Sequence, residues 1–176
     1  MNEIVFLDFD DFSEQNNRLD WLWMLKNEFS NFKVNLFASF SLSSNGFFYY
    51  INNIKWINLC FHGSKHLNNE EVTKKELETA RLDYSFSKVY RAPYWQLSDK
   101  MYKRLKRLGY KIMLHPNDSR EGIKFNWNIK DSPPPLKILY AHGHIQNYPS
   151  GPKGNGLVQA MENILKLPKD TNFRFL

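Results

Sequence analysis

Short apolar runs alternate with amphipathic segments along most of the chain, and this alternation predicts the secondary structure. Apolar runs of strand length are mostly followed by stretches in which apolar residues recur at helical spacing. The predicted strands are Ile4–Phe9, Val34–Phe40, Trp56–Phe61, Lys88–Arg91, Lys111–Leu114, Phe125–Ile129 and Leu136–Ala141. The predicted helices are Asn16–Phe29, Asn68–Ala80, Asp99–Leu108 and Leu157–Leu165, with a short helical or irregular piece at Phe47–Asn53. The pattern predicts the α/β class, with a mostly parallel sheet or barrel whose strands are covered by helices.

Three residues mark predicted helix ends. Ser13 and Ser98 each precede an amphipathic segment, and a serine side chain can accept a hydrogen bond from the first turn of a helix. Gly109 follows the last apolar position of its segment, where glycine commonly ends a helix. We therefore expect caps at Ser13 and Ser98 and a stop at Gly109.

The composition fits one globular domain, residues 1–176. The chain has 176 residues, of which 42% are hydrophobic, enough for a substantial core. Its net charge is +6, but Lys and Arg are spread along the chain with only a short concentration at Lys100–Arg107. This distribution gives no reason to expect a nucleic-acid partner. The single cysteine, Cys60, excludes an intrachain disulfide and lies in an apolar run, where we expect it to be buried and unreactive.

The N-terminal stretch MNEIVFLDFDD does not have the pattern of a signal peptide, because it carries an acid at position 3 and lacks a basic start. No apolar run approaches the ~20 residues that a membrane span needs. We therefore expect no membrane span and a cytoplasmic location.

Candidate chemistry falls at the ends of the predicted strands. In parallel α/β folds, ligands bind beyond the carboxyl ends of the strands. Asp10 and Asp11 follow the first strand, His62 and His66 follow the third, and Arg91 ends the fourth. These side chains are therefore expected to meet at one edge of the sheet.

The histidine pair in the stretch HGSKH suggests a metal site. Residues four apart share one face of a helical turn, so His62 and His66 can bring two imidazoles to one ion. A carboxylate would complete three protein ligands and leave a position for water. Taken alone, the histidines also fit a solvent-facing loop, and Asp10 and Asp11 also fit a polar strand end. The two pairs together favour the metal site.

The stretch VYRAPYW combines an arginine with a rigid backbone. Arg91 can hold a carboxylate through a bidentate pair. Pro93 restricts the residue before it, and the backbone N–H of Tyr94 can then face a developing oxyanion. Tyr94 and Trp95 can also form an apolar wall for a sugar ring, although aromatic residues beside a proline often serve only in packing.

The last apolar run is followed by two histidines, His142 and His144. A histidine with an ordinary pKa of about 6.5 can act as a general acid at neutral pH. One of the two could be only a surface residue, and we prefer His142 for this role because it directly follows the strand.

The order of these motifs resembles that of the polysaccharide deacetylases, carbohydrate esterase family 4. The motifs DFDDF, HGSKH, RAPYW and ILYAH lie within residues 4 to 145. That family carries a paired-aspartate motif, a His-x-x-x-His metal motif, an Arg-x-Pro-Tyr motif and a late Leu-x-His motif. The resemblance implies a distorted (β/α) barrel of about seven strands. It also implies a divalent metal, usually zinc.

The resemblance implies a role for each matching residue. Asp10 would be the catalytic base and Arg91 the residue that orients it. Tyr94 would help to bind the oxyanion through its backbone N–H, and His142 would be the catalytic acid. The implied metal ligands are Asp11, His62 and His66.

The sequence also departs from the family pattern. Phe12 stands where the first motif normally ends in glycine, and it could crowd or reshape the cleft. The fourth motif, with acidic residues and a tryptophan, has no clear counterpart, although Asp118 and Trp127 are candidates. The chain is short for this fold, so the loops that bind substrate are expected to be trimmed.

The sequence therefore predicts a metal-dependent deacetylase that acts on an N-acetylated glycan, with an O-acetyl ester as a further possible substrate. One alternative is a non-catalytic protein with this fold that binds a glycan or a partner, and Phe12 and the missing motif favour it. Another takes two histidines and a carboxylate as the facial triad of a non-haem iron oxygenase. That hypothesis leaves Asp10, Arg91 and His142 without roles.

Overall fold

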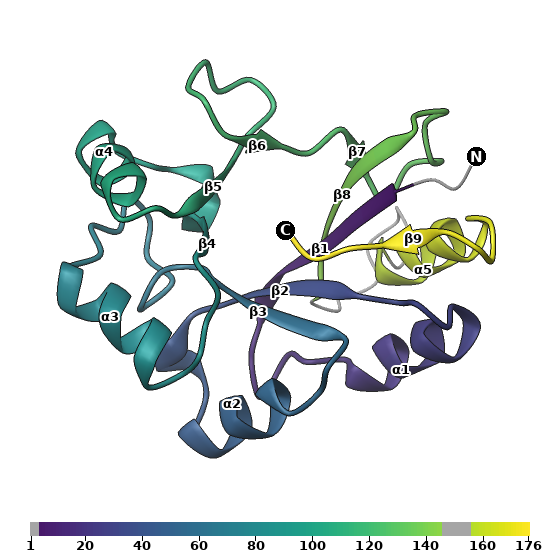
Figure 1. The fold of residues 1–176 in the computed structure, drawn as a ribbon, viewed down its shortest axis with the longest axis horizontal. Helices are drawn as coiled ribbons and strands as arrows, with labels where there is room; N and C mark the ends of the chain where they lie inside the picture. The colour runs from purple at the N-terminus through teal and green to yellow at the C-terminus, as the bar shows by residue number, and fades with distance from the viewer. Residues whose placement is uncertain (1–3, 146–155) are drawn as a thin grey trace.

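The computed structural model describes residues 4–145 and 156–176, which form a strongly curved parallel sheet with helices around it (Figure 1). The strands are β1 (Ile4–Phe12), β2 (Val34–Ala38), β3 (Ile57–Phe61), β4 (Val89–Arg91), β5 (Lys111–Leu114), β6 (Ile123–Lys124), β7 (Trp127–Asn128), β8 (Ile138–His144) and β9 (Asn172–Phe173). Their order is β6-β5-β4-β3-β2-β1-β8-β7, with β9 beside β1. The pairings are parallel, so the strands point their carboxyl ends the same way.

The sheet curls until its two end strands approach each other. Only Phe125 and Asn126 separate β6 from β7 along the chain, although these strands stand at opposite ends of the hydrogen-bonded path. The result is the distorted (β/α) barrel that the motif resemblance implies. The described residues contain nine strands rather than about seven, because three pairings involve strands of only two residues, β6, β7 and β9.

Helices on the outside of the sheet connect most of the strands (Figure 1). They are α1 (Leu19–Glu28), α2 (Asn45–Asn52), α3 (Lys74–Leu82), α4 (Asp99–Arg107) and α5 (Gly156–Leu165), with 3-10 turns η1 (Phe40–Leu42) and η2 (Pro93–Trp95). Thr73 and Glu76 form a capping box at the start of α3, and Ser44 caps α2. These side chains thus satisfy some of the N–H groups that have no partner within the first turns of α2 and α3.

The predicted ends of α4 are confirmed, and the predicted start of α1 is wrong. The Ser98 side chain accepts a hydrogen bond from the Met101 N–H, and Gly109 takes the left-handed conformation that ends the helix, with φ 73°. Ser13 instead accepts a hydrogen bond from the Asn16 N–H in a turn, because β1 continues as far as Phe12. Helix α1 therefore starts at Leu19, with no side-chain cap.

The two faces of the sheet carry different side chains. The main apolar core lies between the sheet and the helices and includes Leu22 and Leu25 of α1 and Leu105 of α4. A smaller apolar cluster lies on the other face and consists of Phe37, Cys60, Val89 and Met113. Burial raises the pKa of the Cys60 thiol to about 12, which makes it unreactive at neutral pH.

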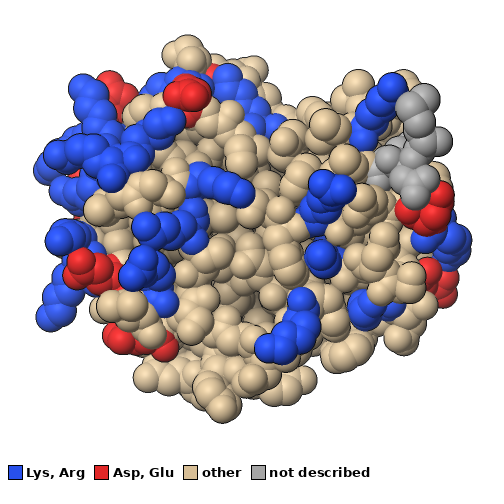
Figure 2. Space-filling view, viewed as in Figure 1, with Lys and Arg blue, Asp and Glu red and all other residues tan. Residues whose placement is uncertain are grey.

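Basic residues are most concentrated over α3 and α4, and Figure 2 shows Lys and Arg gathered on that side of the molecule. Part of this charge is paired at the surface, where Lys106 contacts Glu121 and Lys100 contacts Glu71. In the described part of the chain, no helix has the length and apolar content to cross a membrane.

Candidate active site

A cavity of about 260 Å³ opens at the carboxyl ends of the central strands. Its lining residues are Asp10, Asp11, His62, His66, Tyr94, Trp95 and His144. Of the seven non-glycine residues with positive φ in the described part of the chain, four lie in this lining, namely Asp11, His66, Tyr94 and Trp95. Such strained conformations persist only where the surrounding structure enforces them, and they gather at functional sites.

A bulge at the end of β1 aims both aspartates into the cavity. Neighbouring residues on a regular strand point to opposite faces. Here the register between β1 and β2 shifts between Phe9 and Phe12, and Asp11 takes a left-handed conformation with φ 62°. The bulge therefore brings Asp10 and Asp11 to one site, as the sequence predicts.

The two aspartates remain ionised despite their burial. Burial alone would raise the pKa of Asp10, but the Arg91 guanidinium and the neighbouring imidazoles outweigh it and lower the pKa to about 2. Burial also opposes ionisation of Asp11, yet hydrogen bonds from His144 and His66 hold its pKa well below the ordinary value. Both carboxylates therefore carry negative charge at neutral pH.

The two histidines converge through a loop rather than through the helical turn that the sequence suggests. Residues 62–66 follow β3 without forming a helix. Gly63 and His66 are left-handed, with φ 81° and 57°. These two reversals bring the His62 and His66 rings to a centroid distance of 4.9 Å. The predicted pair therefore meets, but for a different backbone reason.

Asp11, His62 and His66 form a compact group of metal-ligating atoms. One ligand atom from each lies within 4.8 Å of the others. The Asp11 Oδ1 atom is 2.8 Å from His66 Nε2 and 3.8 Å from His62 Nε2. His62 Nδ1 lies 3.0 Å from the Arg91 carbonyl oxygen, to which it can only donate, and this leaves Nε2 as a lone-pair donor facing Asp11. The donor set of two imidazoles and a carboxylate suits zinc and similar divalent ions.

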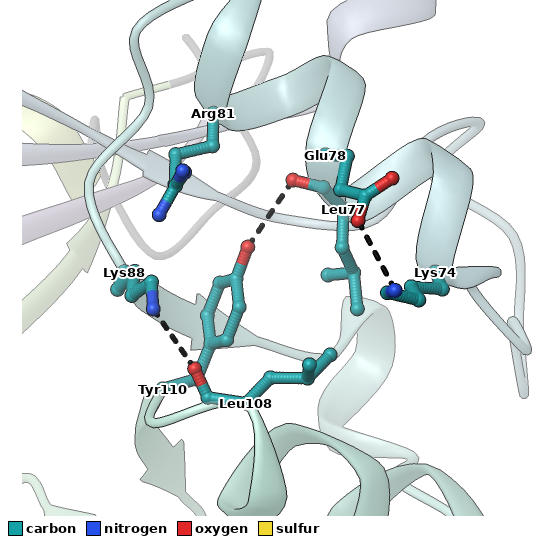
Figure 3. A pocket seen from close by; sticks show the side chains of 7 residues that line it. All are labelled: Lys74, Leu77, Glu78, Arg81, Lys88, Leu108 and Tyr110. Carbon is teal, nitrogen blue, oxygen red and sulfur yellow. Dashed lines mark hydrogen bonds and ion pairs between the residues drawn. The ribbon is translucent and has the colours of Figure 1, made fainter.

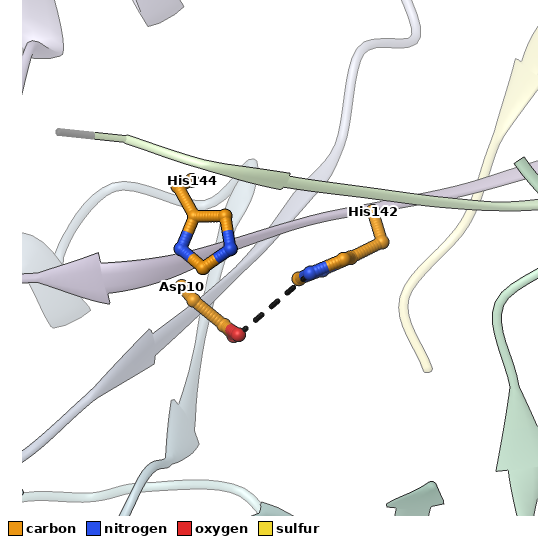
Figure 4. Close-up of side chains that lie close together, drawn as sticks. All are labelled: Asp10, His142 and His144. Atoms are coloured by element: carbon orange, nitrogen blue, oxygen red, sulfur yellow. Dashed lines mark ion pairs between the residues drawn. The ribbon is translucent and has the colours of Figure 1, made fainter. Parts of the chain in front are cut away.

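Asp10, His142 and His144 form a second group of this kind, drawn in Figure 4. Asp10 Oδ1 already lies 2.5 Å from Arg91 Nη1, so a cation here would face a buried guanidinium. Among the described residues, no arginine or lysine is paired with the Asp11 carboxylate. The group of Asp11, His62 and His66 is therefore the better candidate for a metal site.

Arg91 is completely buried at the end of β4 and contacts both Asp8 and Asp10. Its Nη1 atom lies 2.7 Å from Asp8 Oδ1 and 2.5 Å from Asp10 Oδ1. The guanidinium also packs on the rings of Phe37 and Trp95, at 4.1 Å and 4.7 Å from their centroids. These contacts hold Arg91 beside Asp10, as expected, but the second carboxylate was not expected.

Sequence reasoning missed Asp8. Its side chain is fully buried, and its Oδ1 atom accepts a hydrogen bond from Arg91 and lies 2.8 Å from His142 Nδ1. The sequence does contain a signal for Asp8, because it is an ionisable residue within an apolar strand. It also precedes Asp10 by two positions, so both lie on the same face of that strand.

Tyr94 and Trp95 form a strained turn at one side of the cavity. The N–H groups of Trp95 and Gln96 donate to the carbonyls of Ala92 and Pro93. The Tyr94 N–H has no hydrogen-bond partner among the described residues. The Tyr94 side chain is exposed and lies over the His66 ring, with 5.2 Å between centroids.

The two late histidines have different environments. His142 is buried beneath Trp95 and Phe125, whose rings lie 5.1 Å and 5.0 Å from it. His144 is half-buried in the cavity lining rather than on the open surface, and its Nδ1 atom lies 3.0 Å from Asp11 Oδ2. Neither histidine is therefore a plain surface residue.

Phe12 and the two candidates for the fourth motif, Asp118 and Trp127, lie away from this cavity lining. Phe12 is buried in the main core, where it stacks on Phe47, and it does not line the cavity. Asp118 pairs with Arg120, and the Trp127 indole donates to the Asp131 carbonyl. The expected crowding of the cleft by Phe12 is not observed.

Another cavity, of about 130 Å³, lies between α3 and α4 (Figure 3). Lys88 donates to the Leu108 carbonyl, the Tyr110 hydroxyl donates to the Leu77 carbonyl, and Lys74 pairs with Glu78. None of the predicted site residues lines it.

The fold and the site together define a (β/α)-barrel protein with a cluster of carboxylates and histidines, able to bind a metal ion, at the carboxyl ends of its strands. No family model and no curated protein sequence matches the chain. Solved structures do match it, and one of those found is a deacetylase.

A peptidoglycan N-acetylglucosamine deacetylase, crystallised with a substituted benzamide, superposes with a TM-score of 0.63 and 18% identity over 99% of this chain and 86% of that one. The Xyl-CE4 domain of a multidomain xylanase from the hindgut metagenome of Trinervitermes trinervoides superposes with a TM-score of 0.61 and 14% identity, over 100% of this chain and 88% of that one. A 4-alpha-glucanotransferase from Thermococcus litoralis superposes with a TM-score of 0.56 and 12% identity, over 99% of this chain and 40% of that one. These likenesses establish the fold and confirm the barrel that the motif resemblance implies.

Proposed function

We propose that the protein is a metal-dependent hydrolase that removes acetyl groups from an N-acetylated glycan such as peptidoglycan or a chitin-like oligosaccharide. The convergence of Asp11, His62 and His66 beside Asp10 carries the proposal. The structural likeness to a peptidoglycan N-acetylglucosamine deacetylase supports the choice of substrate class. An O-acetyl ester is a further substrate that the same site could hydrolyse.

The metal is proposed to be zinc, held by Asp11, His62 and His66. Three protein ligands leave a coordination position open, which is typical of catalytic zinc sites. When bound, such an ion supplies Lewis acidity and lowers the pKa of a water molecule. His144 supports the site through its contact with Asp11 Oδ2, on the carboxylate oxygen that faces away from His66.

Asp10 and His142 are proposed to act as the base and the acid of the reaction. Arg91 keeps Asp10 ionised and hence able to accept a proton from the attacking water. His142 is buried beside Asp10, with Nε2 3.9 Å from Asp10 Oδ2, and it would give a proton from Nε2 to the departing amine. Water adds to the acetyl carbon, the C–N bond breaks, and the products are acetate and a free amino sugar.

The turn at Tyr94 is proposed to bind the oxyanion and the sugar. The Tyr94 N–H is a donor without a partner among the described residues, as an oxyanion site requires. The exposed Tyr94 ring and the neighbouring Trp95 offer an apolar wall at the cavity edge, against which a sugar ring can pack.

The alternative functions receive less support. The non-catalytic hypothesis relied partly on Phe12, which lies in the core rather than in the cavity. The oxygenase hypothesis explains the facial arrangement of Asp11, His62 and His66. It gives no reason for Asp10 to be paired with a buried arginine.

The test is acetate release from N-acetylglucosamine oligomers and peptidoglycan fragments by the zinc-loaded protein. Asp10→Asn and His62→Ala should each reduce the rate by roughly 100-fold or more. Asp20→Asn, at an exposed carboxylate paired with Arg18, is the matched control and should keep the wild-type rate. Acetate release that survives both Asp10→Asn and His62→Ala would refute the proposed site.

A further inference from the structure

Asp8 lies one layer beneath the candidate active site. It precedes Asp10 by two residues on β1, so both side chains project from the same face of the sheet. Parallel pairing of β1 with β8 sets Asp8 directly beside His142. The Asp8 side chain is fully buried, whereas the sites of metal and substrate lie above it.

The hydrogens on Arg91 decide how Asp8 and His142 interact. The Nη1 atom of a guanidinium carries two hydrogens. Those hydrogens go to Asp8 Oδ1 and Asp10 Oδ1, at 2.7 Å and 2.5 Å. His142 Nδ1, 3.0 Å from Arg91 Nη1, therefore receives no hydrogen from it and must itself donate to Asp8 Oδ1, 2.8 Å away.

This donation fixes the His142 ring. With Nδ1–H held by Asp8, the Nε2 atom is the ring nitrogen that points towards Asp10, 3.9 Å from Asp10 Oδ2. The edges of Trp95 and Phe125 pack around the same ring. An acid that must release its proton from Nε2 needs this orientation.

A buried aspartate such as Asp8 lowers the stability of the fold, which is unexpected for a residue with a purely structural role. Its Oδ2 atom is buried and has no hydrogen-bond partner among the described residues. Asp8 and Asp10 share one guanidinium, that of Arg91. A buried carboxyl group with an unsatisfied oxygen destabilises the fold, so its presence favours a role in function.

We propose that Asp8 is a positioning residue that acts through His142. It holds His142 with Nε2 facing the reacting atoms and so sets the geometry of the acid. This inference rests on the proposed deacetylase function and assigns to it a residue outside the cavity lining.

The first measurement needs no variant of Asp8. The ¹⁵N spectrum of histidine-labelled, zinc-loaded protein reports which ring nitrogen of His142 is protonated, with His142→Gln to assign the signal. We expect protonated Nδ1 in neutral His142. A neutral ring protonated at Nε2 alone would overturn the proposal, whatever the enzyme activity.

The second measurement compares two substrates in Asp8→Asn. An amide needs its leaving nitrogen protonated, whereas 4-nitrophenyl acetate has a leaving group that departs without an acid. We expect Asp8→Asn to lower kcat for an N-acetylglucosamine oligomer roughly 10-fold or more while KM changes by less than about 3-fold. Hydrolysis of 4-nitrophenyl acetate should change by less than about 3-fold.

The outcomes separate the two proposals. Equal losses on both substrates, or no loss on either, would show that Asp8 does not act through the acid. A wild-type protein that releases no acetate from any glycan would refute the proposed function, and the His142 spectrum would still decide whether Asp8 fixes the ring. Asp10→Asn should slow both substrates, because its role precedes departure of the leaving group.

Discussion

Gly63 lies directly against the carboxylate of Glu70, and this contact shapes the loop that carries His62 and His66. A Cβ atom at position 63 would collide with Glu70 Oε2 and touch Pro93 Cγ. Glu70 in turn accepts hydrogen bonds from the backbone N–H groups of three residues that follow Gly63. Two of the three candidate metal ligands, His62 and His66, are therefore held by a loop organised around a single carboxylate.

Removing the Glu70 carboxylate should weaken metal binding. Glu70 accepts hydrogen bonds from the N–H groups of Ser64, Lys65 and Leu67, at 2.7, 3.0 and 3.2 Å. Without them the loop loses its support, so Glu70→Ala should lower zinc affinity by about 10- to 100-fold in calorimetric titration. Glu121→Ala, at an exposed surface pair, is the control. Equal affinities for the two variants would contradict this role of Glu70.

Substitution of Gly63 should destabilise the protein. Its φ of 81° disfavours any residue with a Cβ atom, and the added carbon would meet Glu70 and Pro93. Gly63→Ala should lower the free energy of unfolding by about 1–3 kcal/mol in urea. Gly46→Ala, where an added Cβ meets nothing within 4 Å, should leave stability unchanged or raise it. A Gly63→Ala variant as stable as Gly46→Ala would count against the strained loop.

The sequence predicts most of this site because the carboxyl ends of parallel strands meet at one edge of a sheet. Asp10, His62 and Arg91 each follow or end a recognisable apolar run, so their meeting needs only the topology. Asp8 was missed because its partner His142 lies 134 residues away and becomes visible only from the register of β1 with β8. The backbone reversals at Asp11 and His66 leave no clear mark in the sequence, since neither is glycine.

Very short strands cannot be predicted from the sequence. Strand β9 is only Asn172–Phe173 and depends on β1 for its hydrogen bonds. The predicted strand Phe125–Ile129 is observed only as Trp127–Asn128, which pairs with β8. Two residues carry no periodicity, so these elements depend on tertiary packing alone.

Protonation of Asp10 should make the metal-free protein less stable in acid. Its pKa falls from the ordinary 3.8 to about 2 in the folded protein, so the unfolded chain binds its proton more readily. Its contribution of about 2 kcal/mol is therefore complete above pH 4 and lost as the pH falls towards 2. Urea unfolding of Asp10→Asn should show a weaker pH dependence between pH 5 and 2 than the wild type. Identical slopes would mean that Arg91 does not stabilise ionised Asp10.

Loss of Arg91 should destabilise the fold strongly. Arg91→Met would leave the buried carboxylates of Asp8 and Asp10 without their shared cation. We expect a loss of about 3–5 kcal/mol in the free energy of unfolding at pH 7, partly recovered at low pH as the carboxyls take up protons. Lys74→Met, at an exposed pair with Glu78, should cost no more than about 1 kcal/mol. If Arg91→Met lost no more stability than Lys74→Met, the buried cluster would not be ionised.

The most direct test of the account is to strip the protein with a chelator and return zinc stepwise while acetate release from N-acetylglucosamine oligomers is followed. We predict that activity disappears on chelation and returns in proportion to zinc up to one equivalent per chain. His62→Ala should not recover under the same titration, whereas Asp20→Asn should recover like the wild type. Activity that survives chelation, or that needs two equivalents of zinc, would contradict a single metal held by Asp11, His62 and His66.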